Sequence, residues 1–392
     1  MALDEDGRRA VADELGEGRL AAPDLPRTWK GTGHMNHSVA ESLRKPVGDR
    51  ALETILGVAL ALWCVGEVLF EHSTFAQTLW CVANRPAQFV QALVVGCLVA
   101  ILAAKRFRLG VREVALAFPL LFFALLVWGK TREAHTLVLA LAVICAQGMD
   151  LRRLARMYAV GAACALVVTF AVTGWVYTKD PAFSLKNLVF GRYMFGYFGA
   201  LSCLALGLAS VLSVVVRGRR ARVALAVACV AFAAVSAVPL HSKRCALFLL
   251  LLAAVIVVDL RWPERLEAAL SSRWARWGVA LLPAALFCLV GDMRTLYGAG
   301  FGMGAYANMP KVWGLGFSLT VATLFAISVL GGRGRTVQPV VLAVAVLYAL
   351  LLVFEQLPMN LEFNFGLMAL SLALCPGEDE ASEADGDAEE SR

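Results

Sequence analysis

Long apolar runs alternate with short polar segments along most of this chain. The longest runs can cross a hydrocarbon core about 30 Å thick. None of them shows the strict two-residue alternation of a membrane β-barrel strand. Because only helices and closed barrels satisfy their backbone hydrogen bonds in lipid, the pattern predicts an all-α fold, a polytopic transmembrane helical bundle of about twelve helices. The predicted spans are 51–70, 87–104, 112–129, 134–149, 157–176, 193–216, 223–240, 245–260, 277–291, 314–330, 337–354 and 363–375.

Two polar extensions flank the apolar runs. Residues 1–50 mix acidic, basic, glycine and proline residues without periodicity, and residues 376–392 are strongly acidic. Such compositions are typical of disordered, solvated segments. We therefore expect three parts: a disordered N-terminal extension (1–50), a membrane bundle whose outer loops form the active site (51–375), and a disordered acidic tail (376–392).

The composition agrees with a chain that is solvated mainly by lipid. Hydrophobic residues make up 59% of it and charged residues 17%, whereas about 25% of the residues of a soluble domain are charged. The ten cysteines lie mostly inside apolar runs and form no C-x-x-C pair, so we interpret them as packing residues. The net charge of +6 comes from cations in short loops, a pattern that does not predict nucleic-acid binding.

The distribution of lysine and arginine predicts the orientation of the bundle. Cations are more numerous in one alternate set of loops, which lies around 105–112, 150–156, 217–222, 261–276 and 333–335. Loops rich in Lys and Arg stay in the cytoplasm. We therefore expect this set and both termini to be cytoplasmic, and the other loops to face outward.

Three of the outward segments carry residues that suit chemistry on an anionic substrate: 177–200, 241–244 and 354–364. A guanidinium offers paired donors that match a phosphate. A single cation at a membrane edge is usually an anchor that reaches the interface, and a single tyrosine there is usually part of the aromatic belt. Convergence of several such residues on one face favours a functional site. The candidates are Arg192, Tyr193, Tyr197, His241, Lys243, Arg244, Glu355 and Asn364.

Few ionisable residues lie deep inside the predicted spans. Glu53 and Glu67 sit near the two ends of the first span, where side chains can reach the interface. No series of mid-span carboxylates of the kind used by ion or proton relays is visible. The outward carboxylates are too sparse for a cation cage. The sequence therefore predicts neither a metal site nor another cofactor.

The three outward segments resemble motifs of one family. Residues 192–197 place an arginine before aromatics and a glycine–aromatic pair, and residues 242–245 form a short turn that ends in arginine before a long apolar helix. Residues 355–364 hold a Glu and an Asn before the final helix. In order and spacing, residues 110–375 resemble the polysaccharide polymerases and O-antigen ligases that act on undecaprenyl-diphosphate sugars. The chain departs from that family at 198–201, where the family usually has a His-Pro-Asn step.

The resemblance implies a metal-independent glycosyl transfer. A growing glycan on undecaprenyl diphosphate would be the donor, and a hydroxyl of the next lipid-linked repeat would be the acceptor. Arg192 and Arg244 would hold the diphosphate with help from Lys243, and either Glu355 or His241 would act as general base. Further substrate contacts would come from Tyr193, Tyr197 and Asn364.

The resemblance also implies a location and partners. We expect a multi-pass protein of the bacterial plasma membrane that binds a lipid-linked oligosaccharide, the bilayer itself and other membrane proteins of polysaccharide assembly. The product would be a capsular, exo- or O-type polysaccharide. The alternatives are a ligase of the same superfamily, a flippase or transporter of the lipid-linked glycan, and a non-catalytic scaffold.

Overall fold

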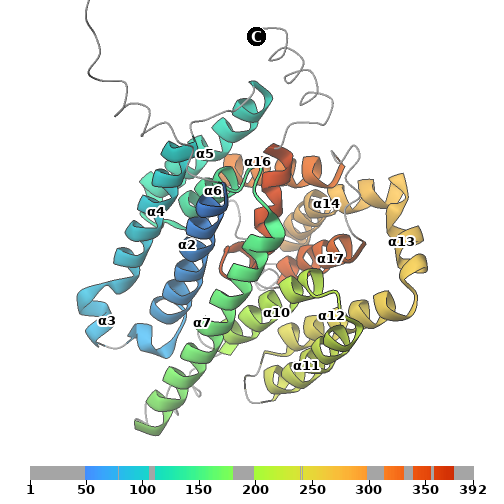
Figure 1. The fold of residues 1–392 in the computed structure, drawn as a ribbon, viewed down its shortest axis with the longest axis horizontal. Coiled ribbons are helices and arrows are strands. Elements are labelled where there is room, and N and C mark those ends of the chain that lie inside the picture. The colour runs from blue at the N-terminus through green and yellow to red at the C-terminus, as the bar shows by residue number, and fades with distance from the viewer. Residues whose placement is uncertain are drawn as a thin grey trace, which may run out of the picture. The chain divides into compact units, whose positions relative to one another are not determined.

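The structure is a computed structural model. It describes residues 49–77, 79–105, 111–179, 198–238, 240, 242–297, 313–330, 339–354 and 357–374. Every regular element within these residues is a helix, which confirms the predicted all-α fold class (Figure 1). The α-helices are α2 (Asp49–Phe70), α3 (Leu79–Asn84), α4 (Pro86–Lys105), α5 (Val111–Thr131), α6 (His135–Cys145), α7 (Leu151–Lys179), α10 (Phe198–Val215), α11 (Arg219–Ala237), α12 (Lys243–Arg261), α13 (Pro263–Ser271), α14 (Arg273–Tyr297), α16 (Gly314–Leu330) and α17 (Pro339–Phe354). The 3-10 helices are η2 (Thr74–Gln77), η3 (Leu357–Met359) and η4 (Phe365–Leu374).

The predicted apolar ranges coincide with these helices, but fewer helices are long enough to be spans. Among the described residues, five helices have the length and hydropathy to cross a membrane, or six if the bent pair α12 and α13 forms one span. They are Arg50–Phe70, Pro86–Lys105, Val114–Thr131, Leu151–Val172 and Arg219–Ala237. The shorter predicted ranges correspond to helices that do not reach this length, as expected for tilted or half-buried segments. Helix α6, for example, has 11 residues and a length of only about 16 Å.

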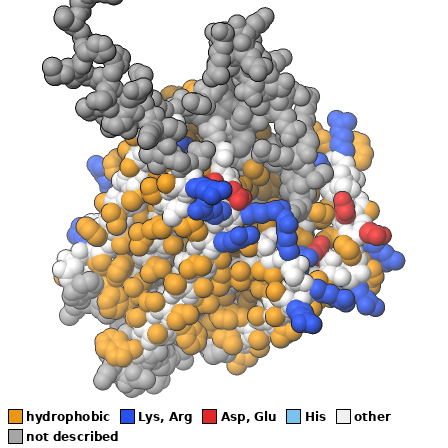
Figure 2. All heavy atoms as spheres, viewed as in Figure 1, with side chains coloured by type: hydrophobic (Ala, Val, Ile, Leu, Met, Phe, Trp, Pro, Cys, Tyr) orange, Lys and Arg blue, Asp and Glu red, His pale blue; other side chains and the backbone are white. Residues whose placement is uncertain are grey.

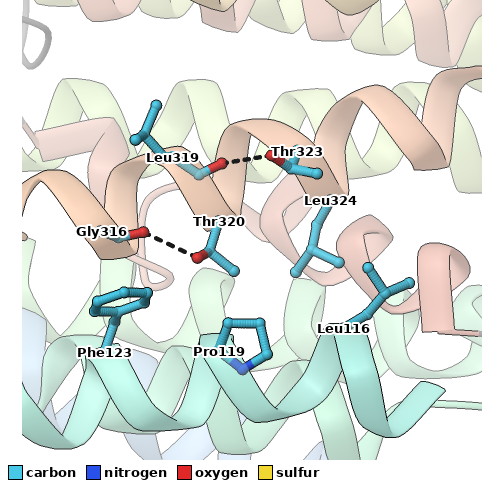
Figure 3. Close-up of a pocket in the computed structure, with 8 residues that line it drawn as sticks. All are labelled: Leu116, Pro119, Phe123, Gly316, Leu319, Thr320, Thr323 and Leu324. Carbon is cyan, nitrogen blue, oxygen red and sulfur yellow. Dashed lines mark hydrogen bonds between the residues drawn. The ribbon is translucent and has the colours of Figure 1, made fainter. Parts of the chain in front are cut away.

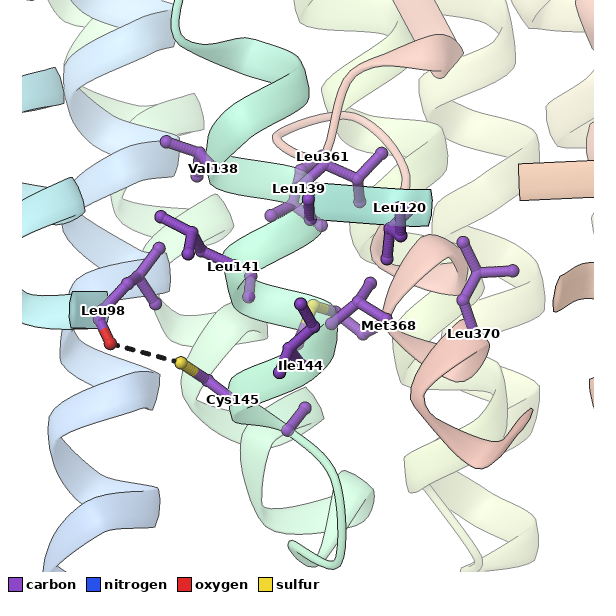
Figure 4. Close-up of a cluster of buried hydrophobic side chains, with 14 of the residues drawn as sticks. Leu98, Leu120, Val138, Leu139, Leu141, Ile144, Cys145, Leu361, Met368 and Leu370 are labelled. Atoms are coloured by element: carbon purple, nitrogen blue, oxygen red, sulfur yellow. Dashed lines mark hydrogen bonds between the residues drawn. The ribbon is translucent and has the colours of Figure 1, made fainter. Parts of the chain in front are cut away.

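One part of the bundle is centred on α6. Helix α2 packs against α4 and α7, while α6 contacts α4, α5 and η4. Every residue of α6 after His135 is buried. Figure 4 shows its leucine and isoleucine side chains among those of Leu120, Leu361, Met368 and Leu370, with the Cys145 thiol directed at the Leu98 carbonyl. The short helix is therefore an internal element of the bundle.

The remaining helices form a second connected set of contacts. Helix α10 contacts α7, α11 and α12, and α12 in turn contacts α11 and α17. Helix α14 packs against α16 and α17, and α16 reaches back to α5 and η4. These contacts bring the start of α12 close to the end of α17, which the site described below uses.

Polar contacts define one end of the α6 part of the bundle. Lys105 Nζ at the end of α4 donates a hydrogen bond to the Cys145 carbonyl at 2.7 Å. Gln147 Nε2 donates to the carbonyl of Leu374, also at 2.7 Å. Arg153 at the start of α7 pairs with Glu53 at 2.9 Å. The loops that carry Lys105 and Arg153 thus share an end, as the predicted topology requires, whereas the assignment of that end to the cytoplasm stays a prediction.

The surface of the bundle is largely apolar. Figure 2 shows hydrophobic side chains over much of the visible face, interrupted by Lys and Arg side chains across its centre and right side. Phe89 on α4 is 73% exposed and Phe118 on α5 is 66% exposed. Apolar area of this extent is unfavourable in water, and it fits a multi-pass membrane protein.

The packing of α10 against α12 leads to a cross-linking prediction. The Sγ atoms of Cys203 and Cys245 lie 3.3 Å apart, and both residues are buried. In a variant that keeps only these two cysteines and carries a protease site near Gly218, iodine should oxidise the two thiols to a disulfide. The cleaved fragments would then migrate together on a non-reducing gel and separate after reduction. Separate fragments despite full oxidation would contradict this helix pairing, and Cys245→Ser is the control.

Candidate functional site

Two carboxylates are buried together inside the bundle. Glu67 lies in the last turns of α2, and Glu362 lies in the turn between η3 and η4. Both side chains are 0% exposed. A buried charge is costly unless it is paired, hydrogen-bonded or bound to a metal. The surroundings of these two groups therefore decide what the site can do.

A neutral donor holds one oxygen of each carboxylate. Trp63 Nε1 donates to Glu362 Oε2 at 3.0 Å, and Gln91 Nε2 on α4 donates to Glu67 Oε1, also at 3.0 Å. The other two oxygens, Glu67 Oε2 and Glu362 Oε1, are buried and accept no hydrogen bond from the described residues. Each carboxylate is thus fixed at one oxygen and directs the other into the cluster.

Two histidines face these oxygens. His135, the first residue of α6, has Nε2 3.7 Å from Glu67 Oε2 and Nδ1 3.9 Å from Glu362 Oε1. His72, which follows α2, has Nε2 3.3 Å from Glu362 Oε1. Trp63 and Phe363 pack edge to face against the two imidazoles, at centroid distances of 5.5 and 5.1 Å. Both histidine side chains are 20% exposed, whereas both carboxylate side chains are fully buried.

The turn that carries Glu362 is held by buried side chains from other helices. Tyr158 Oη on α7 donates to the Glu362 carbonyl at 2.8 Å, and Tyr348 Oη on α17 donates to the Phe363 carbonyl at 3.2 Å. Asn364 Nδ2 donates to the Pro358 carbonyl at 3.1 Å. These bonds satisfy backbone groups that would otherwise be unpaired in an apolar interior, and they fix the position of the carboxylate.

The local electrostatics favour a charged Glu362. Burial raises the pKa of the Glu362 carboxyl. The polar contact with His72 and the charge interactions with His135 and His72 lower it by more, so the pKa lies below its ordinary value. The N-terminus of α6, with its partial positive charge, also begins at His135 beside both carboxylates. Among the described residues, no lysine or arginine forms an ion pair with Glu67 or Glu362.

The structure describes three of the predicted site residues. Lys243 and Arg244 are exposed at the start of α12, and Arg244 Nη1 donates to the Phe354 carbonyl at the end of α17 at 2.8 Å. Asn364 is buried in the turn next to the cluster rather than exposed toward a substrate. The other candidates lie outside the described residues: Arg192, Tyr193, Tyr197, His241 and Glu355.

Sequence reasoning missed the cluster itself. Glu67 was interpreted as a residue that reaches the interface, whereas it is fully buried. The carboxylates were judged too sparse for a cation site, yet one ligand atom each of Glu67, His135 and Glu362 lie within 4.8 Å of one another. A signal was present, because Glu67 and His72 end one predicted span, His135 begins another, and Glu362 precedes the last, all at the predicted outer ends.

A separate apolar pocket lies between α5 and α16. Its volume is about 270 Å³, and Figure 3 shows Phe123 and Pro119 facing Gly316 and Thr320 across it. The threonine hydroxyls there bond to carbonyls of their own helix. None of the residues that line this pocket is ionisable, so we do not place chemistry in it.

Comparisons of the chain with protein-family models, with curated proteins and with solved structures gave no match. The buried cluster offers acid–base groups and metal ligands, and the start of α12 offers cations.

Proposed function

We propose that this protein is a membrane glycosyl transfer enzyme that extends undecaprenyl-diphosphate-linked oligosaccharides. The hydrogen bond from Arg244 to the Phe354 carbonyl is the observation that carries the proposal. It joins the outward turn before α12 to segment 354–364, two of the three segments on which the resemblance rests. A site that binds a diphosphate through several helices requires their ends to lie close together, as the start of α12 and the end of α17 do.

In this proposal the cations act on the leaving group. Arg244 and Arg192, assisted by Lys243, stabilise the negative charge that develops on the departing diphosphate as its bond to the donor sugar breaks and the acceptor oxygen forms the new glycosidic bond. The bond to Phe354 holds the Arg244 guanidinium in one orientation, as bidentate phosphate binding requires. Glu355 or His241 accepts the proton of the attacking hydroxyl.

The main alternative is a flippase or transporter of the same lipid-linked glycan. One observation favours it: ionisable residues buried in a membrane bundle often mark substrate or ion pathways, and Glu67 and Glu362 are such residues. A ligase of the same superfamily would use the same cations but a different acceptor.

The assay that separates these functions uses purified protein in lipid nanodiscs and a labelled undecaprenyl-diphosphate oligosaccharide. Longer lipid-linked products are the result expected of a polymerase. Transfer of the glycan to a lipid A acceptor would identify a ligase. In sealed vesicles, movement of the labelled lipid across the bilayer without lengthening would identify a flippase. If none of these events occurs in folded protein, the proposal is wrong.

A further inference from the structure

We propose that Glu67, His135 and Glu362 bind a divalent transition-metal ion, Zn²⁺ by preference, with His72 as the fourth ligand. This site is independent of the glycosyl transfer proposal, and its test needs no sugar substrate. Three lines of observation lead to it: the distances between the ligand atoms, their missing partners and the type of donor.

The distances suit an ion better than direct contact. Two ligand atoms that each lie about 2.1 Å from a tetrahedral ion are about 3.4 Å apart. His72 Nε2 lies 3.3 Å from Glu362 Oε1. His135 lies 3.7 Å from Glu67 Oε2 through Nε2 and 3.9 Å from Glu362 Oε1 through Nδ1, and both of these distances are too long for a hydrogen bond. One ligand atom each of Glu67, His135 and Glu362 lie within 4.8 Å of one another, so one ion could lie between them with one His135 nitrogen as its ligand.

The proposed ligand residues carry buried polar atoms that lack hydrogen-bond partners. Glu67 Oε2, Glu362 Oε1, His72 Nε2 and His135 Nδ1 are buried and have no hydrogen-bond partner among the described residues. The opposite carboxylate oxygens are held by Trp63 and Gln91. Outer hydrogen bonds of this kind orient the ligands of metal sites and raise their affinity.

The donor set selects the class of metal. Mg²⁺ and Ca²⁺ take oxygen ligands almost exclusively, whereas imidazole together with carboxylate suits zinc and its first-row neighbours.

The experiment measures metal in the full-length purified protein, isolated with an affinity tag that contains no histidine. Elemental analysis after dialysis should find about one Zn²⁺ per chain. Replacement by Co²⁺ should give the intense visible absorption of a tetrahedral site. Glu67→Gln and His135→Ala should lose both signals. Glu71→Gln, an exposed carboxylate one helical turn further along, should keep them.

A variant outside the ligand set distinguishes loss of metal binding from misfolding. Trp63→Phe keeps the aromatic packing but removes the donor to Glu362 Oε2, and it should weaken Co²⁺ binding by about 10–100-fold. Wild-type protein that binds neither Zn²⁺ nor Co²⁺ would overturn the proposal. So would unchanged Co²⁺ affinity in folded Glu67→Gln or in Trp63→Phe.

Discussion

Replacing Arg244 with lysine is expected to reduce the lengthening of lipid-linked glycan by about 10²–10³-fold. A guanidinium carries several donors in one plane and can bind a carbonyl and a phosphate in a fixed geometry, whereas an ammonium group is a point charge without that planar geometry. Because Arg244 is exposed at a helix start, the change should leave membrane insertion and folding intact. The measurement is product length in nanodiscs under single-turnover conditions.

A matched control comes from the opposite end of the neighbouring helix. Arg220 lies at the exposed start of α11, which packs against α12, so Arg220→Lys makes the same chemical change away from the proposed clamp. This variant should retain wild-type lengthening. Arg192→Lys should behave like Arg244→Lys. Full product length in both Arg192→Lys and Arg244→Lys would exclude a diphosphate clamp.

Replacing Gly207 with alanine is expected to lower the free energy of unfolding by about 1–3 kcal/mol. A Cβ atom on Gly207, in α10, would lie 2.6 Å from the Phe363 carbonyl oxygen. This contact is too close to persist, and the oxygen belongs to backbone rather than to a flexible side chain. The turn must therefore move, which strains the hydrogen bond from Tyr158 to the Glu362 carbonyl.

The measurement is unfolding of the purified protein in mixed micelles titrated with a denaturing detergent. Gly96→Ala is the control, because a Cβ on this α4 residue meets nothing within 4 Å. Alanine is the better helix former, so Gly96→Ala should be as stable as the wild type or slightly more stable. Equal stability of Gly207→Ala and Gly96→Ala would show that α10 does not pack against the turn as described.

The fold class could be predicted from the sequence because lipid leaves few choices to the backbone. Apolar runs such as 51–70 and 87–104 had to be helical, and α2 and α4 confirm it. The number of spans could not be predicted in the same way. Hydropathy does not distinguish a helix that faces lipid from one that is surrounded by other helices, and α6 is of the second kind.

The site was only partly predictable, for a different reason. Arg244 was predicted as a site residue because a cation at a predicted outer end is unusual in its own right, and its role stays a prediction. Glu67, His135 and Glu362 are each unremarkable in the sequence, and only tertiary packing brings them together. Their separations along the chain span almost the whole bundle, so no local pattern reports the cluster.

The shortness of α6 has a consequence for the biogenesis of this protein. A segment of 11 residues cannot leave the translocon as a stable, independent span. Its stable insertion therefore requires packing against neighbouring helices. One of these, η4, is translated more than two hundred residues after α6. Until η4 is synthesised, α6 lacks one of the elements that pack against it. We expect the nascent protein to be most sensitive to proteolysis during this interval.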